Sequence, residues 1–171
     1  MPVSLLTRED GGARFSVNLG WGDMVFCFFS NVSFHLEGTG KWGSRFPKLL
    51  LDLCDKGVVS YENIDKLDKE LGTVYHELQE LPLSSAIYDI YDLSSPIPWE
   101  QIPGIENGNL AQSWVTPRGE ESYFKVFSEY IKMAKNYESF LALIFPRETA
   151  FRDSIGQPMK KGRDYWLRDK G

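Results

Sequence analysis

Residues 44–82 read SRFPKLLLDLCDKGVVSYENIDKLDKELGTVYHELQELP, and this pattern predicts two consecutive helices. Ser44 is suited to cap the first helix, and Pro47 falls in its first turn, where a missing amide proton costs nothing. Gly57 can end that helix in the left-handed conformation, and Ser60 can cap the second one. Because no strand separates the two helices, the pattern favours an α+β fold over a regular α/β alternation.

Both predicted helices carry an apolar stripe at helical spacing, as expected for helices that lie on a core. The first stripe contains Leu49, Leu50, Leu53 and Cys54. The second contains Ile64, Leu67, Leu71, Val74, Tyr75, Leu78 and Leu81. A third amphipathic helix is predicted from about Glu120, with the stripe Tyr123, Phe127, Tyr130 and Ala134.

Strands are predicted on either side of these helices. Residues 14–19 alternate between polar and apolar side chains, and Val32, Phe34 and Leu36 repeat the alternation. Residues 86–91 are β-branched and aromatic enough for a third strand, and the continuous apolar run 140–145 predicts a central buried one. The run 24–29 is compatible with a buried strand or a buried helix, because periodicity does not separate them over six residues.

Together these elements predict one α+β domain, with a mixed or antiparallel sheet of about four strands packed against three amphipathic helices. We place this domain at residues 1–146 and expect residues 147–171 to form a basic tail, docked or flexible. Residues 96–119 are rich in proline and glycine and predict a long irregular connection, a kind of segment that often carries function.

The composition is that of a globular protein: 171 residues, 42% hydrophobic and 14% aromatic, with a formal net charge of -5. The negative charge argues against binding nucleic acid or anionic lipid and favours a basic partner. Residues 1–10 show no secretory signal and no apolar run approaches membrane-spanning length, so we expect a cytoplasmic protein. Cys27 and Cys54 are expected to be reduced core residues.

Acidic residues concentrate on the second helix and on the segment that follows it. Eight acids and two lysines lie between Glu62 and Asp92, whereas residues 147–171 hold seven bases and four acids. Tryptophans of the irregular connection are further candidates for partner contact, because aromatic anchors dominate interface energetics; the alternative is that they pack the loop onto the body. The candidate partner-binding residues are Asp65, Asp68, Glu70, Glu77, Glu80, Asp89, Asp92, Trp99 and Trp114.

Residues 38–43 offer an alternative function, since they match the glycine pattern G-x-G-x-x-G of dinucleotide-binding proteins. The match lies between a predicted strand and a predicted helix, as the fingerprint requires. Another helix then follows where a parallel strand is needed, and Lys41 and Trp42 hinder close approach of a pyrophosphate. The simpler interpretation is a glycine-rich turn.

His76 and Glu80 suggest a second alternative, a small metal-dependent hydrolase. The sequence His76-Glu77-Leu78-Gln79-Glu80 resembles half of a zinc-protease motif, with Glu80 in place of the second histidine. The chain has only one other histidine, His35, and a third ligand is required. No G-x-S-x-G nucleophile elbow is present. We therefore expect a binding protein with no catalytic residues, no bound metal and no cofactor.

One set of segments resembles a known family. The set contains Leu36-Glu37, the run Gly40-Lys41-Trp42-Gly43-Ser44-Arg45-Phe46-Pro47, Ile97-Pro98-Trp99, residues 109–116, and Gly119 with the helix that follows it. Together they resemble the bacterial immunity protein 70 family, over about residues 15–145, with Trp42 to Pro47 as the most specific part. Members of this family neutralise toxin domains of polymorphic and contact-dependent growth inhibition systems.

The resemblance implies a non-enzymatic inhibitor that binds the C-terminal domain of a cognate toxin in the cytoplasm of the producing cell. It also implies that the inhibitor blocks the active site or a substrate-binding surface of that toxin. Many such toxins are nucleases with basic substrate grooves, and an acidic surface would speed the encounter with one. The resemblance supplies no contact residues, so the candidates above rest on charge and aromatic character alone.

Overall fold

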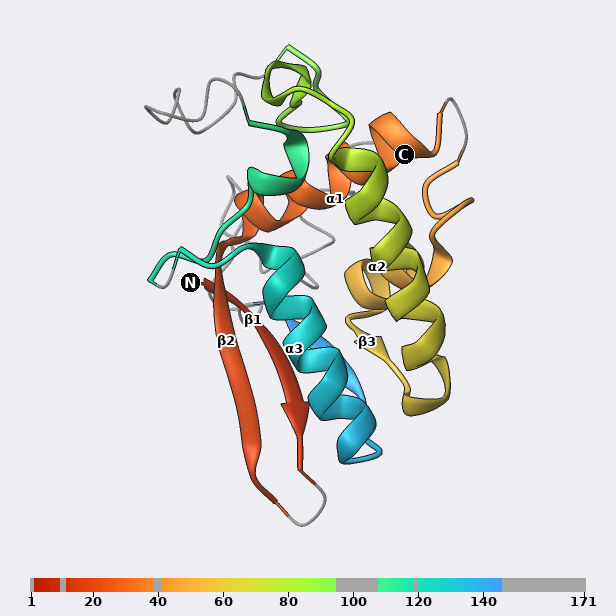
Figure 1. The fold of residues 1–171 in the computed structure, drawn as a ribbon, viewed down its shortest axis with the longest axis vertical. Helices are drawn as coiled ribbons and strands as arrows, with labels where there is room; N and C mark the ends of the chain where they lie inside the picture. Colours follow the sequence, from red (N-terminus) through yellow and green to blue (C-terminus); the bar gives the residue numbers. More distant parts are fainter. Residues whose placement is uncertain (1, 10–11, 39–40, 95–107, 119, 146–171) are drawn as a thin grey trace, which may run out of the picture.

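The computed structural model describes residues 2–9, 12–38, 41–94, 108–118 and 120–145. Its four-stranded sheet is antiparallel throughout, in the order β2-β1-β4-β3 (Figure 1). The strands are β1 (Pro2–Arg8), β2 (Arg14–Trp21), β3 (Val58–Val59) and β4 (Leu141–Ile144). The predicted α+β class is thereby confirmed, whereas the boundary at residue 146 and the tail 147–171 lie outside the described residues.

Strand β4 lies inside the sheet, as its continuous apolar run predicts. It pairs with β1 on one side and with β3 on the other, and Leu141 and Leu143 are almost fully buried. The alternation predicted for residues 14–19 is present in β2, at the edge of the sheet. Strands β1 and β3 were not predicted from the sequence. The sheet is therefore assembled around strands from the two ends of the described chain.

Helix α1 (Gly22–Leu36) contains both the ambiguous run 24–29 and the predicted strand at 32–36, so the strand prediction is wrong. Ten of its fifteen residues are buried. A helix that is apolar on nearly all sides shows no clear helical stripe. The spacing of Val32, Phe34 and Leu36 therefore resembled the alternation of a strand. In the helix, Val32 is buried and Phe34 is exposed.

The strand predicted at residues 86–91 is also wrong: this segment is irregular and lies along α1. Asn31 receives a hydrogen bond from the Ile87 amide at 2.9 Å and donates one to the Ile87 carbonyl at 2.7 Å. The Ile90 amide donates to the Ser30 hydroxyl, and the Cys27 thiol donates to the Ile87 carbonyl. Side chains of a helix thus satisfy the backbone groups that a neighbouring strand would otherwise pair.

The other helices follow the predicted order. They are η1 (Pro47–Lys56), a π-helix, then α2 (Ile64–Leu78) and α3 (Tyr123–Asn136). Phe46, and not the predicted Ser44, occupies the N-cap position of η1 and makes no side-chain hydrogen bond there. The Ser122 hydroxyl caps α3, and Gly57 ends η1 with a φ of 82°. Ser60 precedes a short 3-10 turn and makes no side-chain cap. Among the described residues, no helix is long and apolar enough to cross a bilayer.

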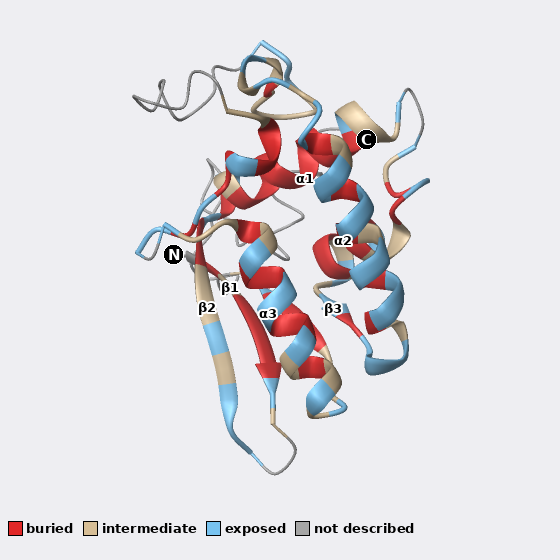
Figure 2. Cartoon of the chain, viewed as in Figure 1, coloured by how far each residue is buried: buried red, intermediate tan, exposed pale blue. Residues whose placement is uncertain are grey.

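The core lies between the sheet and the helices (Figure 2). Phe28 of α1 is fully buried and surrounded by aromatic rings of α1, α3 and residue 114, most of which it meets edge-on. Its neighbours at ring-centroid distances of 5.3 to 5.9 Å are Phe29, Trp114, Tyr123, Phe124 and Phe127. Cys27 and Cys54 are buried and form no disulfide, as predicted, and burial raises the pKa of the Cys27 thiol to about 12. Aromatic packing around α1 thus fixes α3 and residues 110–114.

Candidate functional site

Glu37 binds the backbone of the segment that follows α1. Its carboxylate oxygens accept hydrogen bonds from the amides of Gly43, Arg45 and Phe46 at 2.9 to 3.0 Å. The Ser33 hydroxyl donates to the same carboxylate at 2.7 Å. A cluster of backbone amides of this kind binds anions, and here an anion of the chain itself occupies it.

The dinucleotide pattern at residues 38–43 therefore lacks its structural context. It follows helix α1, where a strand was predicted, and it leads into η1. Gly43 has a φ of 79°, and a Cβ at this position would lie 2.4 Å from Cγ of Leu51. Residues 39–40 lie outside the described residues. Gly43 allows a tight turn that packs against Leu51, which agrees with the interpretation of the motif as a glycine-rich turn.

The other residues between Trp42 and Pro47 also have structural contacts. The Trp42 indole donates to Asp55 at 3.1 Å, and its ring stacks on Phe26. Arg45 donates to the carbonyl of Leu36, at the last residue of α1, and forms a bidentate ion pair with Glu77 of α2. The motif therefore joins α1, η1 and α2. It shapes the fold around the candidate residues.

Asp65 and Asp68, at the start of α2, share one cation from α3. Lys135 lies 2.8 Å from Asp65 and 3.1 Å from Asp68. The hydrogen bond from Lys135, reinforced by its charge, lowers the pKa of the Asp65 carboxyl, and the same bonds raise the pKa of Lys135. Both carboxylates stay accessible, with side-chain exposures of 79% and 48%. They remain available to a partner, although Lys135 offsets part of their charge.

Glu70 and Glu77 bind groups of the chain itself. Glu70 accepts hydrogen bonds from the amides of Lys48 and Leu49, at the start of η1. Burial raises the pKa of Glu70, and these two hydrogen bonds oppose the effect. Glu77 binds Arg45, whose hydrogen bonds lower the pKa of Glu77. Two of the predicted partner-binding acids thus anchor the first residues of η1 and the turn before it.

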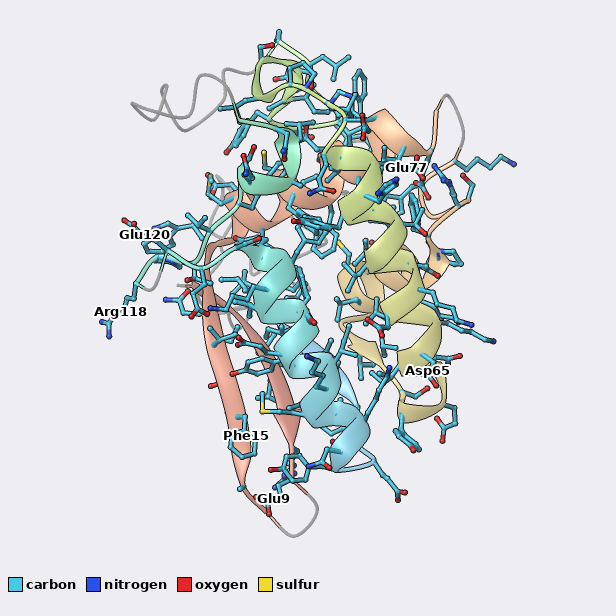
Figure 3. All side chains as sticks on the ribbon, in the orientation of Figure 1. Glu9, Phe15, Asp65, Glu77, Arg118 and Glu120 are labelled. Carbon is cyan, nitrogen blue, oxygen red and sulfur yellow. The ribbon has the colours of Figure 1, made fainter. Side chains whose placement is uncertain are left out.

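Glu80, Asp89 and Asp92 follow the end of α2. Glu80 is exposed and forms no ion pair with any described residue. Asp89 accepts the amide of Tyr91, and Asp92 accepts the amide and the hydroxyl of Ser94, so both shape local turns. Figure 3 shows Asp65 near one end of α2 and Glu77 near the other. Since a fifteen-residue helix spans about 22 Å, the acids are spread along α2 and the segment after it and do not form a compact cluster.

Of the two candidate tryptophans, Trp114 lies among the described residues. Trp114 is 1% exposed, and its ring meets Phe28 edge-on at 5.4 Å. It packs the connection onto the body, which is the alternative that the sequence analysis left open. Trp99 lies outside the described residues.

A groove of about 390 Å³ that was not predicted from the sequence lies between α2 and α3. Its walls are Leu71, Gly72 and Tyr75 of α2 and Phe124, Phe127 and Ile131 of α3, with Asp68, Ser122, Lys125 and Ser128 completing the lining. One sequence signal was available. Gly72 lies in the middle of a helix, where glycine costs about 1 kcal/mol relative to alanine and indicates a packing or functional reason.

The histidines do not gather metal ligands. Within the described part of the chain, no group of three or more His, Cys, Asp or Glu side chains is placed to hold a metal ion. The Nε2 atom of His35 in α1 lies 3.0 Å from the carbonyl oxygen of Ser85, so this ring nitrogen forms a hydrogen bond with the segment just before residues 86–91. His76 and Glu80 thus have no third ligand among the described residues.

Comparison with known proteins identifies a family. The model of the family described as immunity protein 70 matches residues 12–143. No curated protein and no solved structure matches the chain. The match spans β2, the helices α1, η1, α2 and α3 and most of β4, and it includes the whole segment from Glu37 to Pro47 that joins α1 to η1. The chain belongs to the immunity protein 70 family.

Proposed function

We propose that this chain neutralises a cognate toxin by binding the C-terminal domain of the toxin in the cytoplasm and covering its active or substrate-binding surface. The observation that carries this proposal is the family match over residues 12–143. The proposed toxin is a nuclease with a basic substrate groove, because the chain has a net charge of -5 and carries an acidic helix. Inhibition by binding requires no catalytic residue, metal or cofactor.

The contacts proposed for this interface are the accessible acids along α2. Asp65, Asp68 and Glu80 are exposed, and Asp89 and Asp92 continue the acidic surface on the next segment. Glu70 and Glu77 are weaker candidates because they already bind η1 and Arg45. Trp99 stays a candidate from the sequence alone. Trp114 does not, since its side chain is buried.

Co-expression with the toxin domain encoded beside the gene tests the proposal directly. We expect growth to be rescued and a stable complex to be purified with the toxin domain. A folded protein that neither binds nor rescues would contradict the proposal.

Charge reversal tests the acidic surface. The double variant Asp65→Lys with Glu80→Lys should associate with the toxin domain roughly tenfold more slowly at low salt, because it weakens electrostatic steering. Its association rate should also depend less on salt concentration. The matched control is Glu9→Lys with Glu120→Lys, which changes the charge equally at positions away from α2 (Figure 3). Stopped-flow association across a salt series measures both; equal rates for the two double variants would remove this surface from consideration.

A further inference from the structure

We propose that the groove between α2 and α3 receives a large apolar side chain of the cognate toxin, flanked by a basic residue that reaches the acids of α2. This inference rests on the proposed function and identifies where on the chain the toxin binds. The groove holds about 390 Å³ and opens to solvent between two helices that pack against each other. Figure 1 shows α2 and α3 side by side in front of the rest of the domain.

Gly72 forms part of the α2 wall and has no packing role among the described residues. A Cβ at this position would meet no atom of that part of the chain within 4 Å, and the residue is exposed there. Its backbone is helical, so no left-handed conformation requires glycine here. Glycine is among the weakest helix formers, which makes its presence in mid-helix unfavourable for the fold alone. A residue without a side chain lets an incoming group approach the helix backbone closely.

Aromatic side chains give the groove its binding character. Tyr75 is 41% exposed and packs on Phe124 at a ring-centroid distance of 5.0 Å. Phe127 and Ile131 are buried beneath and belong to the core cluster. An accessible aromatic pair over a rigid floor is the kind of pocket that receives a hot-spot side chain at protein interfaces. The floor is preformed, so binding need not order it.

The charges beside the groove favour a basic neighbour for the apolar group. Asp68 lies on the lining and Asp65 is one turn away, both accessible and both sharing the single charge of Lys135. Within this ion-pair group, two carboxylates face one ammonium, so one negative charge is not compensated inside the group, and the nearby Lys69 also acts on Asp65. At the α3 side Lys125 pairs with Glu121 at 3.4 Å, which offsets its charge. A toxin segment with adjacent apolar and basic residues therefore matches both the shape and the charge.

Filling the groove tests the inference. Gly72→Trp places a bulky ring in the space that the toxin side chain would occupy, and Thr73→Trp places the same ring on the neighbouring exposed position outside the groove lining. Calorimetric titration with the toxin domain encoded beside the gene should show at least about thirtyfold weaker binding for Gly72→Trp. Thr73→Trp should stay within about threefold of the original chain.

A second variant, Tyr75→Ala, removes one wall without adding bulk and should also weaken binding, by about tenfold. Thermal unfolding of all three variants separates a filled groove from a damaged fold. Gly72→Trp that binds as tightly as the original chain would overturn the inference while the proposed function stands. Equal losses in Gly72→Trp and Thr73→Trp would overturn it as well, because the effect would not belong to the groove.

Two further outcomes identify a different occupant or a different function. If the original chain dimerises in sedimentation experiments and Gly72→Trp abolishes the dimer but keeps toxin binding, a second copy occupies the groove and the inference is wrong. If the original chain neither binds nor neutralises the toxin domain, the proposed function fails, and this inference fails with it.

Discussion

Helices α1 and α2 have the same length, fifteen residues, but opposite surroundings. Ten residues of α1 are buried, whereas α2 buries five residues along one stripe and exposes most of the others (Figure 2). Polar residues of α1, such as Asn31, lie inside and bind the backbone of another segment. Polar residues of α2, such as Asp65, lie outside and form ion pairs in water. Buried Asn31 of α1 is therefore structural, whereas Asp65 and Asp68 of α2 stay accessible to a partner.

The largest expected difference concerns the aromatic side chains of the two helices. Phe28→Ala should lower the free energy of unfolding by about 4 kcal/mol, because it leaves a cavity among five aromatic rings. Tyr75→Ala on α2 should cost about 1 kcal/mol, since that ring is 41% exposed. Urea titrations followed by circular dichroism measure both values. Similar costs for the two variants would contradict the contrast between the helices.

A smaller effect is expected for the buried amide of α1. Asn31→Ala should lower the free energy of unfolding by about 2 kcal/mol, because the N–H of Ile87 loses its partner and the C=O of Ile87 keeps only the weak thiol donor of Cys27. Hydrogen exchange at the Ile87 amide should accelerate more than exchange in the middle of α2. Asn63→Ala, in the exposed turn before α2, is the control and should cost less than about 0.5 kcal/mol. Unchanged exchange at Ile87 would argue against the role of Asn31.

The smallest effect is expected for an ion pair of α2. Arg45 lowers the pKa of Glu77 below its ordinary value of 4.5, so the pair stabilises the fold above pH 4.5 and loses this effect as the pH falls through the lowered pKa. Glu77→Gln should cost less than about 1 kcal/mol at neutral pH, since both side chains are partly exposed. The difference from the original chain should shrink in acid. Urea midpoints at neutral and acidic pH measure it, with Glu80→Gln as control; a difference that grows in acid would contradict the assignment.

Prediction from the sequence succeeded where an element has one solvent-exposed face and one buried face. The stripes of α2 and α3 are buried apart from Tyr75 and Leu81, and β2 shows its alternation at the sheet edge. It failed for α1, whose burial on several sides removes the helical stripe. It failed again at residues 86–91, because β-branched and aromatic residues pack against a helix as readily as in a sheet.

The candidate site was predictable only in part. The concentration of acids on α2 is visible in the sequence, but the pairing of Glu70 with the amides of η1 and of Glu77 with Arg45 is not. These partners lie 21 to 32 residues away in the chain. The groove was missed for the same reason, since its two walls are about fifty residues apart and meet only when α2 packs on α3.

The sequence by itself determined the α+β class, the paired helices of residues 44–82, the reduced buried cysteines and the negative charge of α2, because these follow from local periodicity and composition. It also carried the family identity. Only the tertiary structure decided that α1 is a helix, that Glu37 fills the amide cluster at Gly43, and which acids remain free to meet a partner. The physical reason is that burial and long-range hydrogen bonds depend on which segments come together, and no local pattern records this.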